Sequence, residues 1–373
     1  MQKQILIAPN AFKNCLSAVE LAGIIKNVIY QSGRDFSCQI APIADGGDGT
    51  IDVINSYFKE SRFITTNVHD PLFRPIKTKW LLLNKDIAIV ELSKASGIAL
   101  LGPEELDPYN ATTFGTGELV KNVLDFGCKK IIITLGGSAT IEAGLGLLSA
   151  LGVDFLDEEK LILKPVMASL SRVQSIDLSK LDSRLQRVKL DVLSDVQNSL
   201  LGKNGVKQFF KQKGVKEEEF NLLETNINHF ANIVQRHINN DKRFDLMGGS
   251  AGGVAFSLMT LLDADVCPGF QFFSKLVSME DIIKKTDTVI TGEGSLDSQT
   301  LMGKAVYELA KLARNCNKKV IALCGQYDKS INWNLYNINK VIQIMPDNGT
   351  VVDSLRNAKS YVEFALRKHI DCL

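Results

Sequence analysis

Four glycine-rich segments, each directly after an apolar, strand-like run, restrict the folds open to this chain. Glycine tolerates positive φ and lets backbone N–H groups approach a ligand closely. A glycine loop between a strand and a helix also points a helix N-terminus outward, where it favours an anion such as phosphate. Carboxylates in two of the segments add ligands for a divalent cation. The segments are 44–50 (ADGGDGT), 135–140 (LGGSAT), 247–253 (MGGSAGG) and 291–297 (TGEGSLD).

Both ends of the chain alternate short apolar strands with amphipathic helices. A capping box at 17–20 opens a helix that places Ala18, Leu21, Ile25 and Val28 on one face. Uniformly apolar strands separated by helices predict a parallel sheet that is covered on both faces. The predicted strands are 5–8, 38–42, 288–291, 320–324 and 341–345, and a helix is predicted at 301–315.

The middle of the chain has a different pattern. Strand candidates at 63–68, 76–83 and 87–92 follow one another without helices, which predicts antiparallel pairing. A helix at 116–125 and a strand at 131–135 come next. The charged, helical stretch 203–243 is interpreted as surface.

A chain of 373 residues is expected to form two domains. The predicted fold class is α/β with two α/β domains. One is a Rossmann-like domain with a parallel sheet, built from residues 1–62 and 285–373. The other is an inserted domain with a mixed sheet, built from residues 63–284, and the active site is expected in the cleft between the two domains.

Composition and missing motifs exclude several function classes. The net charge is +1 with no basic stripe, so neither nucleic acid nor a membrane is expected as a partner. Seven cysteines without a CxxC pair and four histidines argue against a zinc or iron–sulfur site and fit a reducing cytoplasm. The N-terminal apolar run is too short for a signal peptide or a membrane span. A P-loop and a G-x-S-x-G elbow are both missing. The oligomeric state stays open.

The carboxylates of the glycine segments are candidates for metal binding and acid–base chemistry. Asp45 and Asp48 could hold Mg²⁺, or they could form a turn that caps the helix starting at Thr50. Glu293, between two glycines on a predicted loop, has no packing role in the sequence and is interpreted as functional. Asp195 ends another strand and is either a base, a carboxylate next to a metal, or part of an Asx-turn.

Lysines and the repeated GGSA sequence add candidates for phosphate binding. Lys13 and Lys213 could neutralise phosphate charge, although most lysines are simply solvated. Lys304 adds a cation close to the Glu293 segment. GGSA occurs at 136–139 and 248–251, each time before a predicted helix. These small residues either offer N–H donors to one ligand or only allow close helix–strand packing.

Motifs along nearly the whole chain together resemble the glycerate kinase family, in its bacterial type whose product is usually 2-phosphoglycerate. They are Ala8–Lys13 with Leu16–Ala18, Ala44–Thr50, Asp70–Leu72 with Arg74–Pro75, Glu91 with Ala95–Gly97, Thr112–Thr113 with Gly115–Leu119, Gly136–Thr140, Asp195–Val196 with Asn198, Gln212–Gly214, Ala251–Gly253, and Thr291–Asp297 with Gln299–Leu301 and Gly303–Lys304.

The resemblance implies a kinase that uses ATP and Mg²⁺ to phosphorylate D-glycerate. Such transfer needs a positioned metal, cations on the phosphates and a group that accepts the hydroxyl proton. On our assignment, Asp195, Lys13 and Lys304 are catalytic, and Asp45, Asp48, Glu293 and Asp297 bind metal. Substrate and phosphates are assigned to Ser17, Gly46, Gly47, Gly136, Gly137, Ser138, Ala139, Thr140, Lys213, Gly252, Gly253, Gly292, Gly294 and Ser295.

The chain departs from the family pattern in several places, and two functions compete with the first. Asn10 stands where Asp is usual, Ile141-Glu142-Ala143 where Asn-Asp-Gly is usual, Ser199 where Pro is usual and Phe210-Lys211 where Gly-Pro is usual. These changes either shift the substrate preference or are neutral. The competing functions are a kinase for a related small hydroxy acid and a catalytically silent member that senses a ligand.

Overall fold

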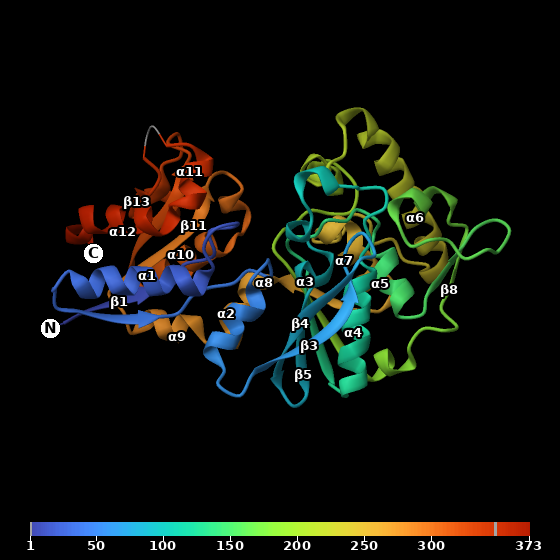
Figure 1. Cartoon of the computed structure of the whole chain (residues 1–373), viewed down its shortest axis with the longest axis horizontal. Coiled ribbons are helices and arrows are strands. Elements are labelled where there is room, and N and C mark those ends of the chain that lie inside the picture. Colours follow the sequence, from blue (N-terminus) through green and yellow to red (C-terminus); the bar gives the residue numbers. More distant parts are fainter. Residues whose placement is uncertain (1, 347–348) are drawn as a thin grey trace. The chain divides into compact units, whose positions relative to one another are not determined.

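The computed structural model describes residues 2–346 and 349–373 and contains two compact units (Figure 1). Unit 1 consists of Met1–Asp45, Asp52–Tyr57 and Phe270–Leu373. Unit 2 consists of Gly46–Ile51 and Phe58–Gly269. Each unit has its own sheet and is described by itself.

Unit 1 contains a five-stranded, entirely parallel sheet in the order β13-β12-β11-β1-β2. With its strands renumbered within the unit, this is the doubly wound order 2-1-3-4-5, in which the winding direction reverses between β1 and β11. The strands are β1 (Lys3–Ile7), β2 (Phe36–Ile40), β11 (Thr288–Leu296), β12 (Lys319–Tyr327) and β13 (Lys340–Gln343).

Helices cover both faces of the unit 1 sheet. The apolar side chains of α1 and α12 form one core with the strands, while α10 packs on β11 and β12 together with α9. The predicted buried face of α1 and its capping box are both confirmed. The helices of this part are α1 (Ala18–Gln31), α2 (Thr50–Tyr57), α8 (Gly269–Leu276), α9 (Met279–Lys284), α10 (Ala305–Asn315), α11 (Val351–Arg356) and α12 (Ala358–Lys368).

Unit 2 contains a mixed six-stranded sheet in the order β10-β9-β6-β5-β4-β3. Strands β3, β4 and β5 pair antiparallel, as the sequence predicts, and the remaining pairs are parallel. These strands are β3 (Arg62–His69), β4 (Pro75–Asn84), β5 (Ile87–Glu91), β6 (Lys130–Thr134), β9 (Lys189–Ser194) and β10 (Asp265–Pro268). Strands β7 (Asp154–Leu156) and β8 (Ser175–Asp177) form a separate two-stranded antiparallel sheet.

The helices of unit 2 bury an extensive apolar core against its sheet. They are α3 (Ser93–Ser96), α4 (Phe114–Phe126), α5 (Leu145–Ala150), α6 (Phe220–Ile238) and α7 (Ser250–Leu261). The predicted fold class, with two α/β domains, a parallel sheet in one and a mixed sheet in the other, is confirmed.

Three local predictions are wrong. Residues 291–297 do not form a loop, because β11 continues to Leu296 while β12 pairs with it as far as Tyr327. The helix predicted at 301–315 begins only at Ala305, because Gly303 takes φ of 104° and separates it from a short 3₁₀ turn. The stretch 203–243 is not only surface, since Phe210 and Phe230 are fully buried.

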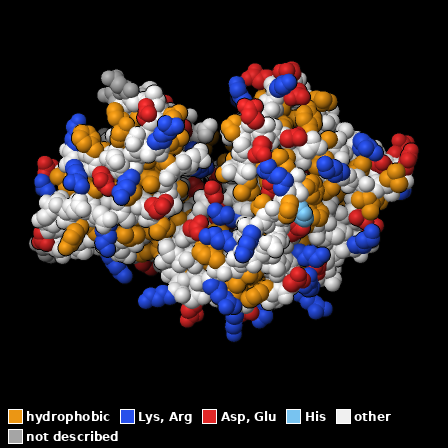
Figure 2. All heavy atoms as spheres, viewed as in Figure 1, with side chains coloured by type: hydrophobic (Ala, Val, Ile, Leu, Met, Phe, Trp, Pro, Cys, Tyr) orange, Lys and Arg blue, Asp and Glu red, His pale blue; other side chains and the backbone are white. Residues whose placement is uncertain are grey.

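In the part of the chain that is described, the helices show no sign of a membrane-spanning segment, and the face in Figure 2 shows no sign of a single-sign charge. On the face drawn in Figure 2, Lys and Arg side chains are interspersed with Asp and Glu side chains. Among the described residues, no helix has the length and apolar character needed to cross a bilayer. None of the seven cysteines, all of which lie in the described part of the chain, forms a disulfide.

Candidate active site

Two glycine loops of unit 2 touch each other and enclose Asp195. The N–H of Gly136 donates to the carbonyl of Gly46 over 3.0 Å. A Cβ added to Gly136 would lie 2.4 Å from Cα of Gly47 and 2.9 Å from Oδ2 of Asp195. Only glycine fits at Gly136, and the contact holds the half-buried Asp195 carboxylate against the loops.

Lys213 binds to the loop that follows Gly136. Its buried Nζ donates to Oγ of Ser138 at 2.8 Å and to the carbonyl of Thr140 at 2.6 Å. Burial lowers the pKa of Lys213 to about 8, although the nearby carboxylates of Glu142 and Asp195 oppose the shift. The first GGSA loop is therefore held by a buried cation that also faces Asp195.

The second GGSA segment packs on the first. Ala251, Gly252 and Gly253 all have positive φ, at 53°, 67° and 96°, which bends the start of α7. A Cβ on Gly252 would lie 2.2 Å from the carbonyl oxygen of Thr140, and the Gly252 carbonyl accepts from the N–H of Ala143 at 3.0 Å. The sequence left two interpretations for the small residues of this segment, N–H donation to a ligand or close packing. Close packing explains Gly252.

Asp48 lies on the open side of the same cluster. Its side chain is 49% exposed and accepts hydrogen bonds from Ser93 Oγ at 3.0 Å and Lys94 Nζ at 3.3 Å. Desolvation opposes ionisation of Asp48, but the hydrogen bond with Glu91 and the charge of Lys94 outweigh it and lower the pKa of Asp48. A pocket of about 430 Å³ opens here, and Lys77 also lines it.

Glu91 is a functional candidate to which the sequence assigned no role, although the residue belongs to the motifs of the resemblance. Its fully buried carboxylate accepts from the backbone N–H groups of Gly49 at 2.8 Å and Ile51 at 3.0 Å. Burial raises the pKa of Glu91 to about 7, against the charge of Lys94. Because Glu91 occupies the N-terminus of α2, those two donors are not open to a phosphate. The only sequence signal was a carboxylate at the end of an apolar strand.

The departures at 141 and 142 have structural explanations. Ile141 is fully buried in the core of unit 2. Glu142 is also fully buried, and its carboxylate accepts from the N–H groups of Thr113 at 2.8 Å, Gly144 at 2.6 Å and Gly146 at 3.2 Å. Burial raises the pKa of Glu142, while these hydrogen bonds oppose the shift. Glu142 therefore satisfies the N-terminus of α5.

A second group of charged residues lies in unit 1, at the carboxyl ends of its strands. Glu293 is buried within β11 and accepts from Oγ1 of Thr300 at 2.9 Å. Burial raises the pKa of Glu293 to about 7, with Lys304 and Lys13 opposing the shift and Asp45 adding to it. The structure thus brings together four of the predicted site residues, Lys13, Asp45, Glu293 and Lys304.

Asn10 shows how the loop after β1 joins this group. Its amide Nδ2 donates to Oδ2 of Asp45 at 3.0 Å, and its backbone N–H donates to the carbonyl of Gly292 at 2.9 Å. The amide at this position is therefore a donor that orients Asp45. An aspartate here, the usual residue of the family, would place a second carboxylate beside it.

Two predicted site residues are engaged in capping. Oδ1 of Asp297 accepts from the N–H groups of Gln299 at 2.8 Å and Thr300 at 3.3 Å, so at most Oδ2 can serve an ion. Ser17 forms the capping box of α1 with Glu20 and is exposed. Within the described residues, no three His, Cys, Asp or Glu side chains are grouped so that they could hold a metal by themselves.

Comparison with known proteins assigns these features to one family. Residues 5–373 match the family described as "Glycerate kinase family". The chain belongs to the glycerate kinase family. The glycerate kinase of Bacillus subtilis (strain 168) is 35% identical over 98% of this chain and 96% of its own length. The glycerate 2-kinase of Escherichia coli (strain K12) is 32% identical over 95% of this chain and 94% of its own length.

A solved structure of this family shares the fold. It is a candidate glycerate kinase 2 from Salmonella typhimurium LT2, with a TM-score of 0.81 and 32% identity, and the match covers 100% of this chain and 98% of that one. Family membership confirms the resemblance seen in the sequence, and this chain shares the fold and the enzyme class of the glycerate kinases.

Proposed function

We propose that this chain transfers the γ-phosphoryl group of ATP to a hydroxyl group of D-glycerate, with Mg²⁺ bound to the nucleotide. Family membership over nearly the whole chain supports the reaction class. The name of the Escherichia coli relative, glycerate 2-kinase, supports 2-phospho-D-glycerate as the product. The observation that carries the proposal is the cluster of Asp195 and buried Lys213 around two glycine loops, because phosphoryl transfer depends on positioned charges and a proton acceptor.

The residues of unit 2 fit the acceptor side of this reaction. Asp195 accepts the proton of the glycerate hydroxyl as that oxygen attacks phosphorus. Lys213 fixes the Ser138 loop and places positive charge beside Asp195. Lys77 and Lys94 line the pocket at Asp48 and favour an organic anion such as a carboxylate.

The carboxylates present also fit Mg²⁺. This ion keeps several waters and needs only one or two carboxylates besides the phosphates. Asp48 in unit 2 is partly exposed and ionised, and Asp45 and Glu293 in unit 1 lie together beside two lysines. When bound, Mg²⁺ would neutralise charge on the β- and γ-phosphates. Lys13 and Lys304 would supply further positive charge there.

The location of the complete site stays a prediction. We retain the expectation that it forms between the two domains and that domain closure accompanies catalysis. We also retain a cytoplasmic location, which the lack of disulfides among the seven cysteines supports.

A coupled assay of ADP release, with Mg·ATP and a panel of hydroxy acids, tests the proposal. Turnover with D-glycerate is the expected result, and phosphorus NMR of the product distinguishes 2- from 3-phosphoglycerate. Turnover with another acid but not with D-glycerate would show that the other acid is the substrate. Nucleotide binding without any turnover would instead support a silent, ligand-sensing protein.

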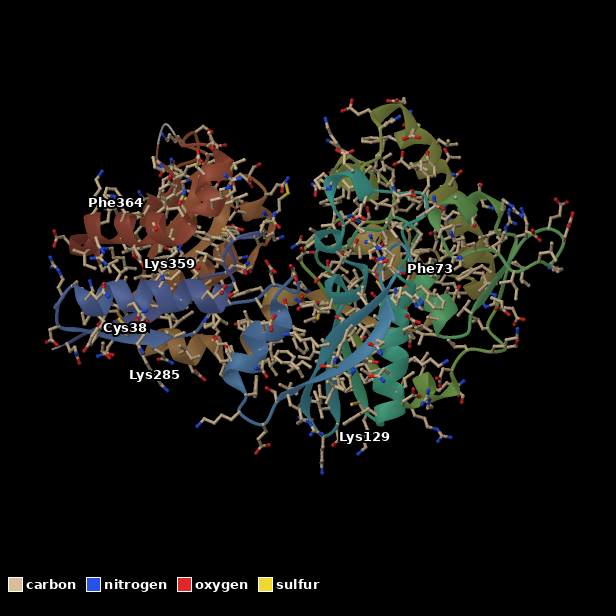
Figure 3. The ribbon with its side chains drawn as sticks, viewed as in Figure 1. Cys38, Phe73, Lys129, Lys285, Lys359 and Phe364 are labelled. Atoms are coloured by element: carbon tan, nitrogen blue, oxygen red, sulfur yellow. The ribbon has the colours of Figure 1, made fainter. Side chains whose placement is uncertain are left out.

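Asp195→Asn tests the proposed base. We expect kcat to fall by at least ~10²-fold, as losses of general acid–base groups typically do, with little change in thermal stability. Asp86→Asn is the matched control, since Asp86 lies in the β4–β5 turn and its carboxylate pairs with the exposed Lys129 (Figure 3) at 3.1 Å. Equal rates for the two variants would remove Asp195 from the mechanism.

A further inference from the structure

A small, largely apolar pocket lies in unit 1, where the segments that follow β1 and β13 meet the ends of β11 and β12. Its volume is about 90 Å³. Six apolar residues line it, together with Gln326 and Ser354, and Lys13, Gly294 and Gly325 border it. The apolar residues are Phe12, Cys15, Ile344, Met345, Leu355 and Ala358.

The pocket lies at the edge of the sheet where a ligand is expected. In doubly wound sheets, ligands bind outside the carboxyl ends of the strands, at the point where the winding direction reverses. Here that point lies between β1 and β11, and Lys13 and Gly294 come from the segments that end these two strands. A Cβ on Gly294 would meet only the backbone nitrogen of Lys13, at 4.0 Å, so this edge of the sheet is open.

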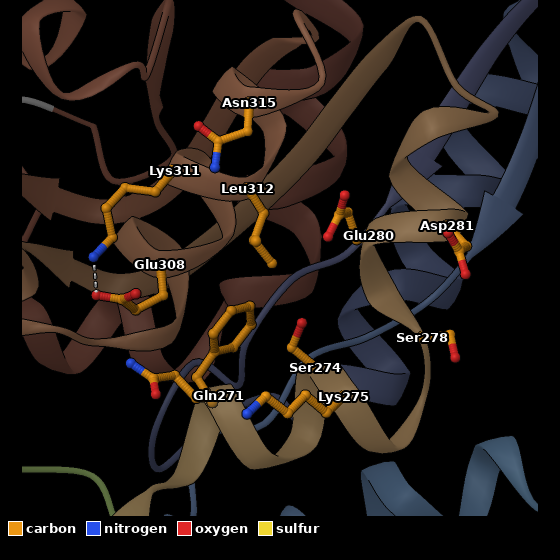
Figure 4. A pocket seen from close by; sticks show the side chains of 11 residues that line it. Gln271, Ser274, Lys275, Ser278, Glu280, Asp281, Glu308, Lys311, Leu312 and Asn315 are labelled. Atoms are coloured by element: carbon orange, nitrogen blue, oxygen red, sulfur yellow. Dashed lines mark ion pairs between the residues drawn. The ribbon is translucent and has the colours of Figure 1, made fainter.

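A larger pocket of about 560 Å³ in the same unit does not have this position (Figure 4). It is bordered by α8, α9 and the later turns of α10, which lead back toward the start of β12. Its lining carboxylates are already paired with lysines: Glu308 with Lys311 of the same lining at 2.5 Å, and Glu280 with Lys284, outside the lining, at 2.8 Å. The small pocket, in contrast, adjoins a lysine that also acts on Glu293.

We propose that the small pocket receives the base of the nucleotide, with the triphosphate extending past Lys13 and Gly294 toward Glu293. This inference rests on the proposed kinase function. A nucleoside triphosphate is flat and weakly polar at one end and strongly anionic at the other, which matches apolar walls beside a lysine. Glycerate carries an oxygen on every carbon and would leave those walls without a partner. The volume encloses only part of a base, so its outer edge lies against the 39% exposed Leu355.

Protection of Cys15 from alkylation tests the location. Cys15 lines the pocket and its thiol donates to the carbonyl of Phe12 at 3.3 Å. Burial raises the pKa of both Cys15 and Cys38, so labelling with iodoacetamide is run at an alkaline pH and followed by peptide mass spectrometry. Cys38 in β2 (Figure 3) does not line the pocket and is the internal control.

At an ATP concentration of about ten times Kd, we expect alkylation of Cys15 to slow about tenfold while that of Cys38 is unchanged. D-Glycerate alone should protect neither thiol. Unprotected Cys15 in a protein that phosphorylates glycerate would overturn the pocket assignment and leave the kinase function standing. Equal protection of Cys15 and Cys38 would also overturn it, because a general tightening of the unit would then explain the result.

A pair of variants on α11 provides a second test. Leu355→Glu replaces an apolar wall of the pocket by a carboxylate that repels the triphosphate. We expect KM for ATP to rise about tenfold or more, with KM for glycerate unchanged. Val352→Glu makes the same type of change on the same helix at a 56% exposed residue outside the pocket lining, and should leave both constants unchanged. Equal KM values for ATP in the two variants, or an increase in KM for glycerate alone, would refute the proposal.

Discussion

Gly136→Ala tests whether the two glycine loops of unit 2 work by close approach. The added Cβ would lie 2.4 Å from Cα of Gly47 and 2.9 Å from Oδ2 of Asp195. Carbon atoms prefer separations of about 3.5–4.0 Å, so the two loops must move apart by roughly 1 Å. The first contact is with backbone, which cannot rotate away as a flexible side chain would.

The expected losses follow from this displacement. Overpacking of this kind costs about 1–3 kcal/mol, which corresponds to a Tm lower by several degrees for a unit of this size. A shift of about 1 Å at a catalytic group costs about 10²-fold in rate, so kcat should fall to about a hundredth. The hydrogen bond from Gly136 to Gly46 should weaken as well.

Thermal unfolding and steady-state kinetics check both losses. Gly23→Ala is the matched control, since this glycine lies inside α1 with nothing within 4 Å of an added Cβ. There the change should stabilise the protein by roughly 0.5–1 kcal/mol and leave kcat unaltered. Wild-type kcat in Gly136→Ala would refute the argument, and a lower Tm with full kcat would show that the loop contact serves packing alone.

Two further predictions concern pH. Because burial lowers the pKa of Lys213 to about 8, kcat/KM of the free enzyme should fall as pH rises through about 8. Arginine keeps its charge at this pH, so the fall in kcat/KM of the Lys213→Arg variant should move to higher pH. A fall at an unchanged pH would mean that another group causes it. Burial raises the pKa of Glu293 to about 7, well above the usual value of a glutamate, so its contribution to stability is lost as pH rises toward that value. Chemical denaturation should therefore show Glu293→Gln stabilised by about 1–3 kcal/mol at pH 8 and hardly at pH 4.5. An equal gain at both values would contradict a buried carboxylate.

Local periodicity predicted most of the fold. The buried stripe and capping box of α1 lie within a few residues of each other, so the sequence displays them directly. The antiparallel group β3–β5 was also predictable, because its connections are too short to contain a helix. The extension of β11 to Leu296 was not, because it depends on pairing with β12.

The contacts of the site could be predicted less well, because their partners lie far apart in the chain. The Glu91 carboxylate accepts hydrogen bonds from Gly49 and Ile51, which lie about forty residues earlier in the chain. No local sequence pattern predicts contacts over that separation. From the sequence, Lys213 was a candidate for neutralising phosphate charge. The sequence could not show that its ammonium group is buried against Ser138 and Thr140, since this depends on how β6 and η6 (Lys211–Lys213) pack.

The structure also changes what the glycine segments are expected to do. The sequence suggested that helix N-termini would bind phosphate, yet after three of the four segments a carboxylate of the chain itself accepts from those N–H groups. Glu91 does so at α2, Glu142 at α5 and Asp297 at the turn before α10. An anion there would have to displace a side-chain carboxyl group that already accepts from those N–H groups.

Charge for the phosphates must then come mainly from lysines and the metal, while the glycines act through close approach. Added Cβ atoms on Gly136, Gly252 and Gly292 would each lie within 2.4 Å of backbone in a neighbouring segment. A helix dipole is screened by salt, whereas a steric contact is not. The decrease in kcat of Gly136→Ala should therefore be the same at low and high ionic strength. A decrease that becomes smaller at high salt would show that the helix dipole contributes to catalysis.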